Sequence, residues 1–292
     1  MPSVPPVVLT IAGFDPSAGA GVTADIKVIA AHECYGVGCI TALTVQSTQG
    51  VRRVEAVDPK VIGQTLTELA ADFAIEAVHI GMLGNEEAVA VVADFLATAR
   101  PPHVVLDPIL RSTSGAELLN AAGMKQMVKR LFPLTELVTP NLEEAAALTS
   151  LSAPDPTASA SAAIEIMRQA ARNLHALGAT NIVVTGGHLE KAVDLLSFTT
   201  SRGVEQEVFK AERQRSTSTH GTGCAFSTAL ACHLAYGRGL PEAVLLSKAY
   251  VSAAISKAPR LGRGNGPLHH LYRMQEQRRP AKVVTEAEPA HS

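Results

Sequence analysis

The chain has 292 residues, of which 47% are hydrophobic and 18% are charged, and its formal net charge is −2. This length and composition suit one large α/β domain, and the even spread of charge gives no electrostatic footprint for nucleic acid or a membrane surface. The four cysteines show neither the paired spacing of a zinc site nor the density of a secreted disulfide scaffold. No apolar run is long enough to span a bilayer. We therefore expect a cytoplasmic protein whose partners are small molecules.

Short apolar runs alternate with longer helical patterns along the chain. The predicted strands, in chain order, cover residues 7–12, 36–45, 51–57, 77–80, 103–106, 137–139, 181–184, 193–199 and 207–211. Helices are predicted from Val22 onward and over residues 59–73, 86–99, 118–132, 162–177, 225–236 and 241–257. This order predicts an α/β fold with a mainly parallel central sheet, helices on both of its faces and a small antiparallel edge formed by the last two strands.

Nothing in residues 1–274 resembles a linker, so we predict a single domain over this range. Residues 152–161 are rich in Pro, Ala and Ser and are predicted to form a surface loop rather than a domain boundary. Residues 275–292 are charged and poor in apolar clusters, which predicts a disordered tail.

Small and polar residues follow the predicted parallel strands. These strands end at Gly13, Gln46, Gly81, Asp107, Thr139 and Thr185. In an open α/β sheet such ends share one edge, and ligands bind there. The loop over residues 13–21 is rich in small residues, as expected for a loop that closes on a ligand. Asp25 follows it, and a carboxylate early in a helix also has a simpler interpretation, because it stabilises the helix N-terminus by about half a kcal/mol.

Carboxylates and an amide stand at two of these strand ends. Asp107 follows four apolar residues, where it could cap the next turn or help to hold a metal with a nucleotide phosphate. Asn141 and Glu144 are three residues apart at a predicted helix start, which places them on one face. They fit a capping pair at least as well as two oxygen ligands that face Mg2+ and phosphates.

The turn at residues 219–224 (THGTGC) leads into an apolar helix. Glycines at a helix start let the backbone approach a ligand closely, and the free N–H groups there favour phosphate or a phosphoryl group that gains charge in a transition state. Cys224 stands where the helix begins, and the helix N-terminus could lower the pKa of its thiol and make it a proton acceptor. An ordinary tight turn with a buried cysteine is the simpler alternative.

Two common nucleotide-binding motifs are missing from the sequence. There is no GxxxxGK[ST] motif, and no GxGxxG follows the first strand. These absences argue against a P-loop enzyme and against a Rossmann dehydrogenase.

Eight segments in order resemble the hydroxymethylpyrimidine/phosphomethylpyrimidine kinases of thiamine biosynthesis, which belong to the ribokinase-like superfamily. The segments are TIAGFDPSAGAGVTADIK (10–27), ITALTVQSTQG (40–50), IGML (80–83), VLDPILRSTSG (105–115), TPNLEEA (139–145), VTGGHL (183–189), THGTGCAFSTALA (219–231) and GPLHH (266–270). The resemblance implies a ribokinase-like fold and a homodimer. It also implies MgATP-dependent phosphorylation of 4-amino-5-hydroxymethyl-2-methylpyrimidine and then of its monophosphate, with ATP and Mg2+ as cofactors.

The resemblance also implies roles for individual residues. Cys224 matches the catalytic base, and Gly221 and Gly223 match the anion hole. The pyrimidine pocket corresponds to Gln46, Gly21, Asp25, Met82 and Ile109. Asp107 and Glu144 match metal positions, with Asn141 beside them on the phosphates, and Thr185, Gly187 and Thr219 fall on the nucleotide side. An amide such as Gln46 can donate to and accept from an aminopyrimidine at once.

Three positions depart from the family pattern. Many relatives carry lysine where Thr185 and Thr217 stand, and a threonine is frequent in place of Phe14. Fewer cations near ATP could weaken nucleotide binding, and a larger residue at position 14 could narrow the pocket mouth. The alternatives are a pyridoxal or pyridoxine kinase of the same superfamily and a catalytically silent ligand-binding protein on the same fold. Gln46 and Met82 favour the pyrimidine, while Asp107, Glu144 and the turn at 221–224 speak against a silent protein.

Overall fold

The protein is described by a computed structural model that covers residues 4–112, 114–152, 159–186, 192–212, 214, 216 and 218–277. Its elements, in chain order, are β1 (Val7–Phe14), α1 (Gly21–Ala31), β2 (Tyr35–Ser47), β3 (Gly50–Ala56), α2 (Pro59–Asp72), β4 (Ile75–Ile80), α3 (Glu86–Ala99), β5 (His103–Leu106), α4 (Ala121–Arg130), η1 (Phe132–Leu134), β6 (Leu137–Val138), α5 (Leu142–Thr149), α6 (Ala160–Ala176), β7 (Ile182–Gly186), β8 (Ala192–Thr200), β9 (Gly203–Ala211), α7 (Thr222–Ala235), α8 (Leu240–Ser256) and α9 (Tyr272–Gln277).

The strands of the described residues form one sheet in the order β3-β2-β1-β4-β5-β6-β7-β8-β9. β1, β2, β4, β5, β6 and β7 pair in parallel, whereas β3 at one edge and β8 with β9 at the other pair antiparallel. This arrangement confirms the predicted α/β fold with a mainly parallel sheet and a small antiparallel edge.

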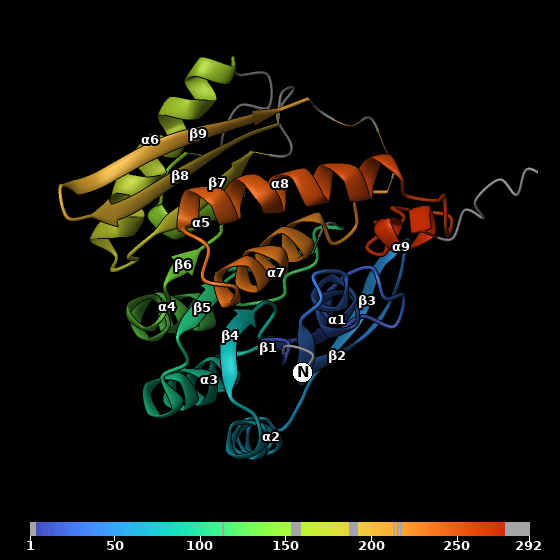
Figure 1. The fold of residues 1–292 in the computed structure, drawn as a ribbon. Coiled ribbons are helices and arrows are strands. Elements are labelled where there is room, and N and C mark those ends of the chain that lie inside the picture. The colour runs from blue at the N-terminus through green and yellow to red at the C-terminus, as the bar shows by residue number, and fades with distance from the viewer. Residues whose placement is uncertain are drawn as a thin grey trace, which may run out of the picture.

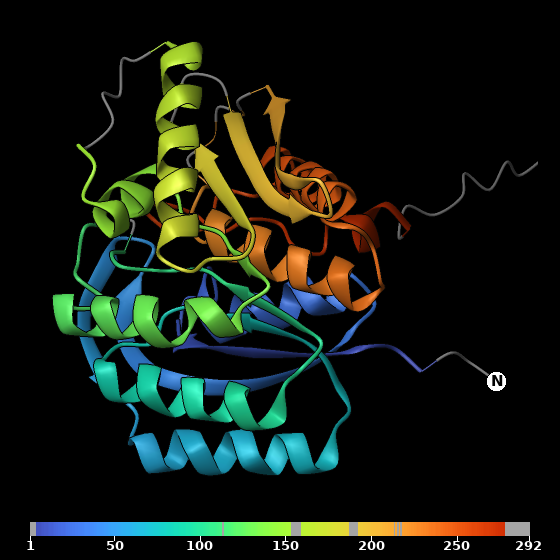
Figure 2. The same ribbon diagram turned by 90° about the vertical axis from the view of Figure 1, so that its left-hand side faces the viewer.

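Helices cover both faces of the sheet, with α1, α7 and α8 on one face and α2, α3 and α4 on the other (Figure 1). Figure 2 shows α2, α3 and α4 stacked side by side. The strands feed both layers because neighbouring side chains point to opposite faces. Val78 and Val104 belong to the core under α2 and α3, while the adjacent Ala77 and Val105 belong to the core under α7. Strands buried on both faces explain why the sequence shows continuous apolar runs.

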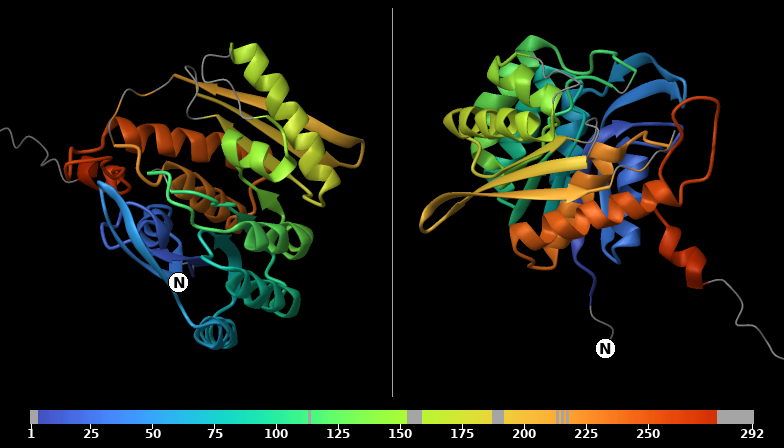
Figure 3. Two further views of the ribbon diagram at one scale, coloured as in Figure 1. Left: turned by 180° about the vertical axis from the view of Figure 1, so that it is seen from behind. Right: turned by 90° about the horizontal axis from the view of Figure 1, so that it is seen from above.

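Helix α7 is buried on nearly all sides, because it lies across β1, β4 and β5 and is covered by α1 and α8. The views from behind and from above in Figure 3 show the same central position. A helix that is apolar all round is stable only in such an enclosed place. Its packing therefore holds the N-terminus of α7, with Gly221 as cap, at the carboxyl ends of the parallel strands.

One helix is shorter than predicted. The expected helix over residues 118–132 begins at Ala121, because Asn120 caps it by accepting a hydrogen bond from the Gly123 backbone N–H at 2.8 Å. Leu118 instead donates its backbone N–H to Leu110. At the other end of the chain α9 extends to Gln277, and residues 278–292 of the predicted tail lie outside the described residues, as do residues 153–158 of the predicted loop. None of the described helices is long and apolar enough to cross a membrane.

Candidate active site

The N-terminus of α7 touches the loop that follows β1, and glycines make this contact possible. Gly221 has φ of 80°, and a Cβ on it would lie 1.9 Å from the carbonyl oxygen of Gly19. Gly21 has φ of 60°, and its Cβ would lie 2.1 Å from the carbonyl oxygen of Gly13. Any other residue would be strained and would clash. The backbone of the loop therefore lies against the first turn of α7, whose N–H groups have no partners within the helix.

A pocket of about 1690 Å³ opens at the carboxyl ends of the parallel strands. Its walls include the ends of β1, β2, β5, β6 and β7 together with the turn before α7: Gly13, Gln46, Asp107, Thr139, Thr185, Gly221, Gly223 and Cys224. The prediction that the strand ends share one edge of the sheet is therefore confirmed, and a pocket opens at that edge. Pockets for single drug-sized ligands have volumes of roughly 300–1,000 Å³, so this pocket has room for two substrates.

Most of the residues predicted for the site line this one pocket. They are Cys224, Gly221, Gly223, Gln46, Gly21, Met82, Ile109, Asp107, Asn141, Glu144, Thr185 and Thr219. Gly187 lies outside the described residues, as does the departure at Thr217. Phe14, which also departs from the family pattern, lines the pocket as well.

Asp25 is the exception, because it is fully buried and does not line the pocket. Its carboxylate accepts hydrogen bonds from the hydroxyls of Thr10 at 2.7 Å and Thr228 at 2.9 Å, and it lies 3.3 Å from His79 Nδ1. The carboxylate points inward because Asp25 belongs to the buried face of α1, one turn past its start. Both interpretations from the sequence are wrong here, since Asp25 neither faces the pocket nor stands in the first turn of the helix.

Cys224 is the third residue of α7, and its side chain is buried against Asp107. The Asp107 carboxylate and the backbone N–H of Gly21 lie close to the thiol. Burial raises the pKa of the Cys224 thiol well above its usual range, and the negative charges of Asp107 and Asp25 raise it further. The expectation that the helix N-terminus lowers this pKa is wrong, because burial and two carboxylates outweigh the helix dipole.

The carboxylates beside Cys224 fit a divalent cation. Burial raises the pKa of Asp107, and the nearby charges of Glu144 and Asp25 add to this effect. A cation between Asp107 and Glu144 would relieve this repulsion, and it would also lower the pKa of the adjacent thiol. Mg2+ is commonly held by one or two carboxylates together with substrate phosphates. The described residues contain no cluster of three or more His, Cys, Asp or Glu side chains that could hold a metal ion.

Asn141 and Glu144 form the capping pair at the start of α5. Asn141 Oδ1 accepts the Glu144 backbone N–H, and the Glu144 carboxylate accepts the Asn141 backbone N–H, both at 2.9 Å. The capping interpretation is therefore confirmed, and both side chains also line the pocket. Burial raises the pKa of Glu144 from 4.5 to about 7, so the cap carries a carboxyl group that titrates near neutral pH.

Replacement of Glu144 by Gln should change how stability depends on pH. A carboxyl whose pKa is raised on folding binds its proton more tightly in the folded state, so stability is lost as pH rises from 4.5 to about 7. Gln keeps the capping acceptor without the charge. Thermal unfolding without nucleotide or Mg2+ should show Glu144→Gln more stable than the wild type at pH 8, by up to about 3 kcal/mol, and closer to it at pH 4.5. If the stability of the two proteins depended on pH in the same way, the raised pKa of the buried Glu144 carboxyl would be contradicted.

Two close pairs of a basic and an acidic side chain in the pocket wall were not predicted. His220 Nε2 lies 2.8 Å from Asp15 Oδ2, and Lys248 Nζ lies 2.5 Å from Asp194 Oδ2. Lys248 therefore reaches the pocket from α8 on the side of Thr185, one of the positions where relatives carry lysine. A lysine in the middle of the largely apolar helix predicted over residues 241–257 was the available signal for it. Asp15 and His220 each stand inside a segment that the sequence analysis singled out, but nothing in the sequence paired them.

Comparison with known proteins places this site in a family. Residues 15–269 match the family described as phosphomethylpyrimidine kinase. The chain is 40% identical over 273 residues to the thiamine biosynthesis bifunctional protein ThiED of Geobacter sulfurreducens, a match that covers 93% of the chain but only 53% of that protein. It is 37% identical to the hydroxymethylpyrimidine/phosphomethylpyrimidine kinase of Haemophilus influenzae, over 90% of the chain and 96% of the relative.

A similar fold is found in the ADP complex of Bacillus subtilis pyridoxal kinase, with a TM-score of 0.80 and 30% identity over 91% of this chain and 97% of that one. The fold, the pocket and the long match to curated kinases agree with one another. The chain belongs to the phosphomethylpyrimidine kinase family.

Proposed function

We propose that the protein transfers the γ-phosphoryl group of ATP to the hydroxyl of 4-amino-5-hydroxymethyl-2-methylpyrimidine and then transfers a second phosphoryl group to the resulting monophosphate, as a step of thiamine biosynthesis. The family and the names of its relatives support this reaction. One observation carries it in the structure: Cys224, Asp107 and the open N–H groups of α7 meet in the same pocket as Gln46.

Phosphoryl transfer requires positioning and charge stabilisation more than covalent chemistry. In the proposed mechanism, Cys224 accepts the proton of the attacking hydroxyl. The N–H groups of Gly221, Gly223 and their neighbours receive the oxygens of the transferred group as their charge grows. Asp107 and Glu144 would hold Mg2+, which supplies charge neutralisation on the ATP phosphates when bound. Deprotonation of a buried thiol next to Asp107 is unfavourable, so the mechanism needs that carboxylate charge to be compensated.

The two substrates are assigned to opposite ends of the pocket. We place ATP beside Asn141, Thr185 and Thr219, where Lys248 also lines the pocket and supplies a lysine on the side of Thr185. The pyrimidine lies between Gly21, Gln46, Met82 and Ile109. The Thr41 hydroxyl donates to the Met82 carbonyl at 2.5 Å, which fixes the backbone behind this wall.

Mass spectrometry of the reaction products tests the proposed two-step reaction. A reaction with MgATP and the hydroxymethyl substrate should show the monophosphate first and then the diphosphate.

Replacement of Gln46 by Ala should raise the KM for the hydroxymethylpyrimidine by about tenfold or more and leave the KM for ATP nearly unchanged. The reason is the loss of an amide that pairs with the amino group and ring nitrogen together, because a site built for such hydrogen bonds discriminates strongly. Initial-rate kinetics with each substrate varied in turn provide the measurement. Gln206→Ala in β9, outside the pocket, is the matched control. Equal rises in both KM values would refute the assignment of Gln46.

A pyridoxal kinase is the second candidate, and the structural similarity to the Bacillus subtilis enzyme favours it. The general fold and the anion hole serve either acceptor, so the choice rests on the pocket wall. Gln46 and Met82 both line the pocket, as the pyrimidine assignment requires.

We also propose that residues 1–274 act as one kinase domain and that the protein is a cytoplasmic homodimer. Sedimentation at assay concentrations tests the dimer.

A further inference from the structure

A hydrogen bond between His220 and Asp15, which are 205 positions apart in the sequence, joins the turn before α7 to the loop over residues 13–21. Asp15 also accepts hydrogen bonds from the backbone N–H groups of Ser17, Gly19 and Ala20 and from the Ser17 hydroxyl, at 2.7–3.1 Å. The backbone of His220 is held on its other side, where its N–H donates to the Gly266 carbonyl at 3.1 Å. The imidazole is therefore fixed in position at the wall of the pocket.

One edge of the imidazole is occupied and the other is open. Nε2 faces Asp15, whereas Nδ1 makes no hydrogen bond to any residue that the structure describes and is not enclosed. The His220 side chain keeps 15% of its surface exposed. Burial alone would raise the pKa of Asp15, but hydrogen bonds from His220 and Ser17 lower it to about 2, so this carboxylate stays ionised and accepts a hydrogen bond from the ring.

His220 lies beside the anion hole and near the part of the pocket wall that contains Gln46. It lines the main pocket next to Gly221 and also borders a small cavity of about 50 Å³ whose wall includes Gln46. A monophosphorylated pyrimidine held by Gln46 would present its phosphate toward the anion hole, and His220 lines both cavities that contain Gln46. Among the basic residues of the described wall, Lys248 is bound to Asp194 on the nucleotide side, while Arg111, Lys210 and Arg260 are exposed.

We propose that His220, oriented by Asp15, binds the phosphate of the monophosphorylated acceptor and so selects it for the second transfer. This inference rests on the proposed two-step reaction. In the proposed complex Nε2–H donates to Asp15 and Nδ1–H donates to a phosphate oxygen, so the ring meets the negative charge that the acceptor brings into a pocket already lined by Asp107 and Glu144. The hydroxymethyl substrate carries no such charge, so His220 matters less for the first transfer. No bond to His220 forms or breaks.

His220→Gln provides the test, because its amide nitrogen can still donate to Asp15 while the second ring nitrogen is lost. The readout is the ratio of kcat/KM for the purified monophosphate to kcat/KM for the hydroxymethyl substrate. We expect this ratio to fall by about ten- to a hundredfold, as for loss of a hydrogen bond to a charged group. His103→Gln breaks a similar pair, His103 with Glu136 at 2.7 Å, outside the pocket, and should leave the ratio as in the wild type.

Parallel losses of both activities in His220→Gln would overturn the inference and leave His220 as a structural anchor. A selective loss in Arg111→Gln instead would move the phosphate contact to Arg111. Wild-type protein inactive on both acceptors would overturn the proposed function itself. If His220→Gln does not fold, modification of the wild type by diethyl pyrocarbonate, followed by mass spectrometry, decides the question. The monophosphate should protect His220 more strongly than the hydroxymethyl substrate, and equal protection would contradict the assignment.

Discussion

Cys224→Ala should lower kcat by about a hundredfold or more, the range expected for loss of a general base, with little change in either KM. The thiol is the proton acceptor in the proposed mechanism, and it lies between the first turn of α7, the Gly21 N–H and Asp107. An interaction used only in the transition state affects kcat and kcat/KM equally when it is removed. Steady-state kinetics with the hydroxymethyl substrate and ATP measure this.

Cys39→Ala is the control for this variant. Cys39 is also a buried thiol, but it lies in β2, contacts the Ile62 carbonyl and does not line the pocket. Its loss should affect stability and leave kcat close to that of the wild type. Full activity in Cys224→Ala would remove Cys224 from the mechanism and transfer the role of proton acceptor to Asp107, the carboxylate in contact with it.

Gly221→Ala should be at least as damaging, because it affects the backbone of the anion hole. An alanine at φ of 80° costs about 1–2 kcal/mol, and its Cβ would also lie 1.9 Å from the Gly19 carbonyl oxygen. The loop over residues 13–21 or the first turn of α7 must then move. We expect kcat/KM to fall by about a hundredfold or more and unfolding to require less denaturant, as measured by initial rates and by urea titration.

Gly237→Ala, just past the other end of α7, is the control that separates the cost of the positive φ from the cost of the steric clash in Gly221→Ala. Gly237 has φ of 73°, and a Cβ there would meet nothing within 4 Å. It should therefore lose only the free energy of the unfavourable φ, about 1–2 kcal/mol, and keep its activity. If the two variants were equally stable and equally active, the close contact between Gly221 and Gly19 would play no part in the site.

The general layout of the site could be predicted because it follows from the polypeptide backbone. Parallel strands end at one edge, so Gln46, Asp107 and Thr185 had to meet there once the alternation of strands and helices was recognised. The Asn141 cap was also readable, since its partner is three residues away. Local patterns of this kind need no knowledge of tertiary packing.

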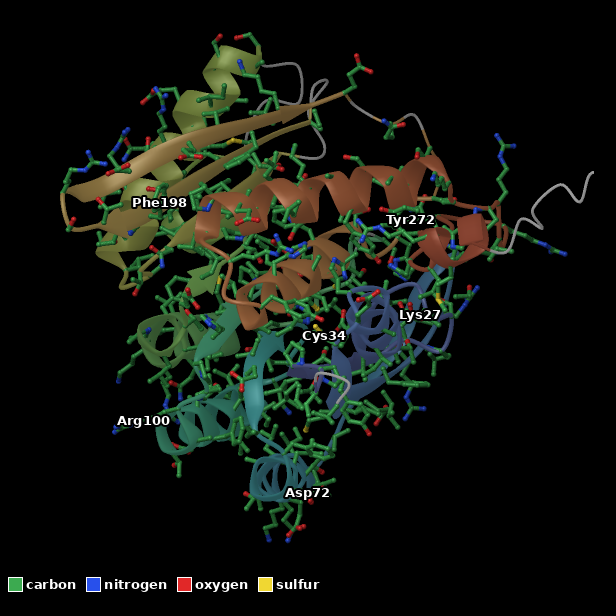
Figure 4. All side chains as sticks on the ribbon, in the orientation of Figure 1. Lys27, Cys34, Asp72, Arg100, Phe198 and Tyr272 are labelled. Atoms are coloured by element: carbon green, nitrogen blue, oxygen red, sulfur yellow. The ribbon has the colours of Figure 1, made fainter. Side chains whose placement is uncertain are left out.

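What the sequence could not predict depends on contacts between distant residues. The direction of the Asp25 side chain is decided by Thr10, Thr228 and His79, which come from three other elements. The protonation of Cys224 is decided by burial and by Asp107, and both outweigh the local effect of the helix end. Figure 4 shows how densely side chains fill the interior around α1, where Cys34 lies, whereas Asp72 and Arg100 lie at the periphery.

The choice of acceptor tests most directly whether the protein is a pyrimidine kinase. Release of ADP from MgATP should be followed by a coupled assay with hydroxymethylpyrimidine, its monophosphate and pyridoxal, each supplied separately. We expect ADP release with both pyrimidines, at a higher kcat/KM than with pyridoxal. Release with pyridoxal alone would keep the fold and the anion hole but contradict the pyrimidine assignment, and no release with any of the three would contradict the kinase reaction itself.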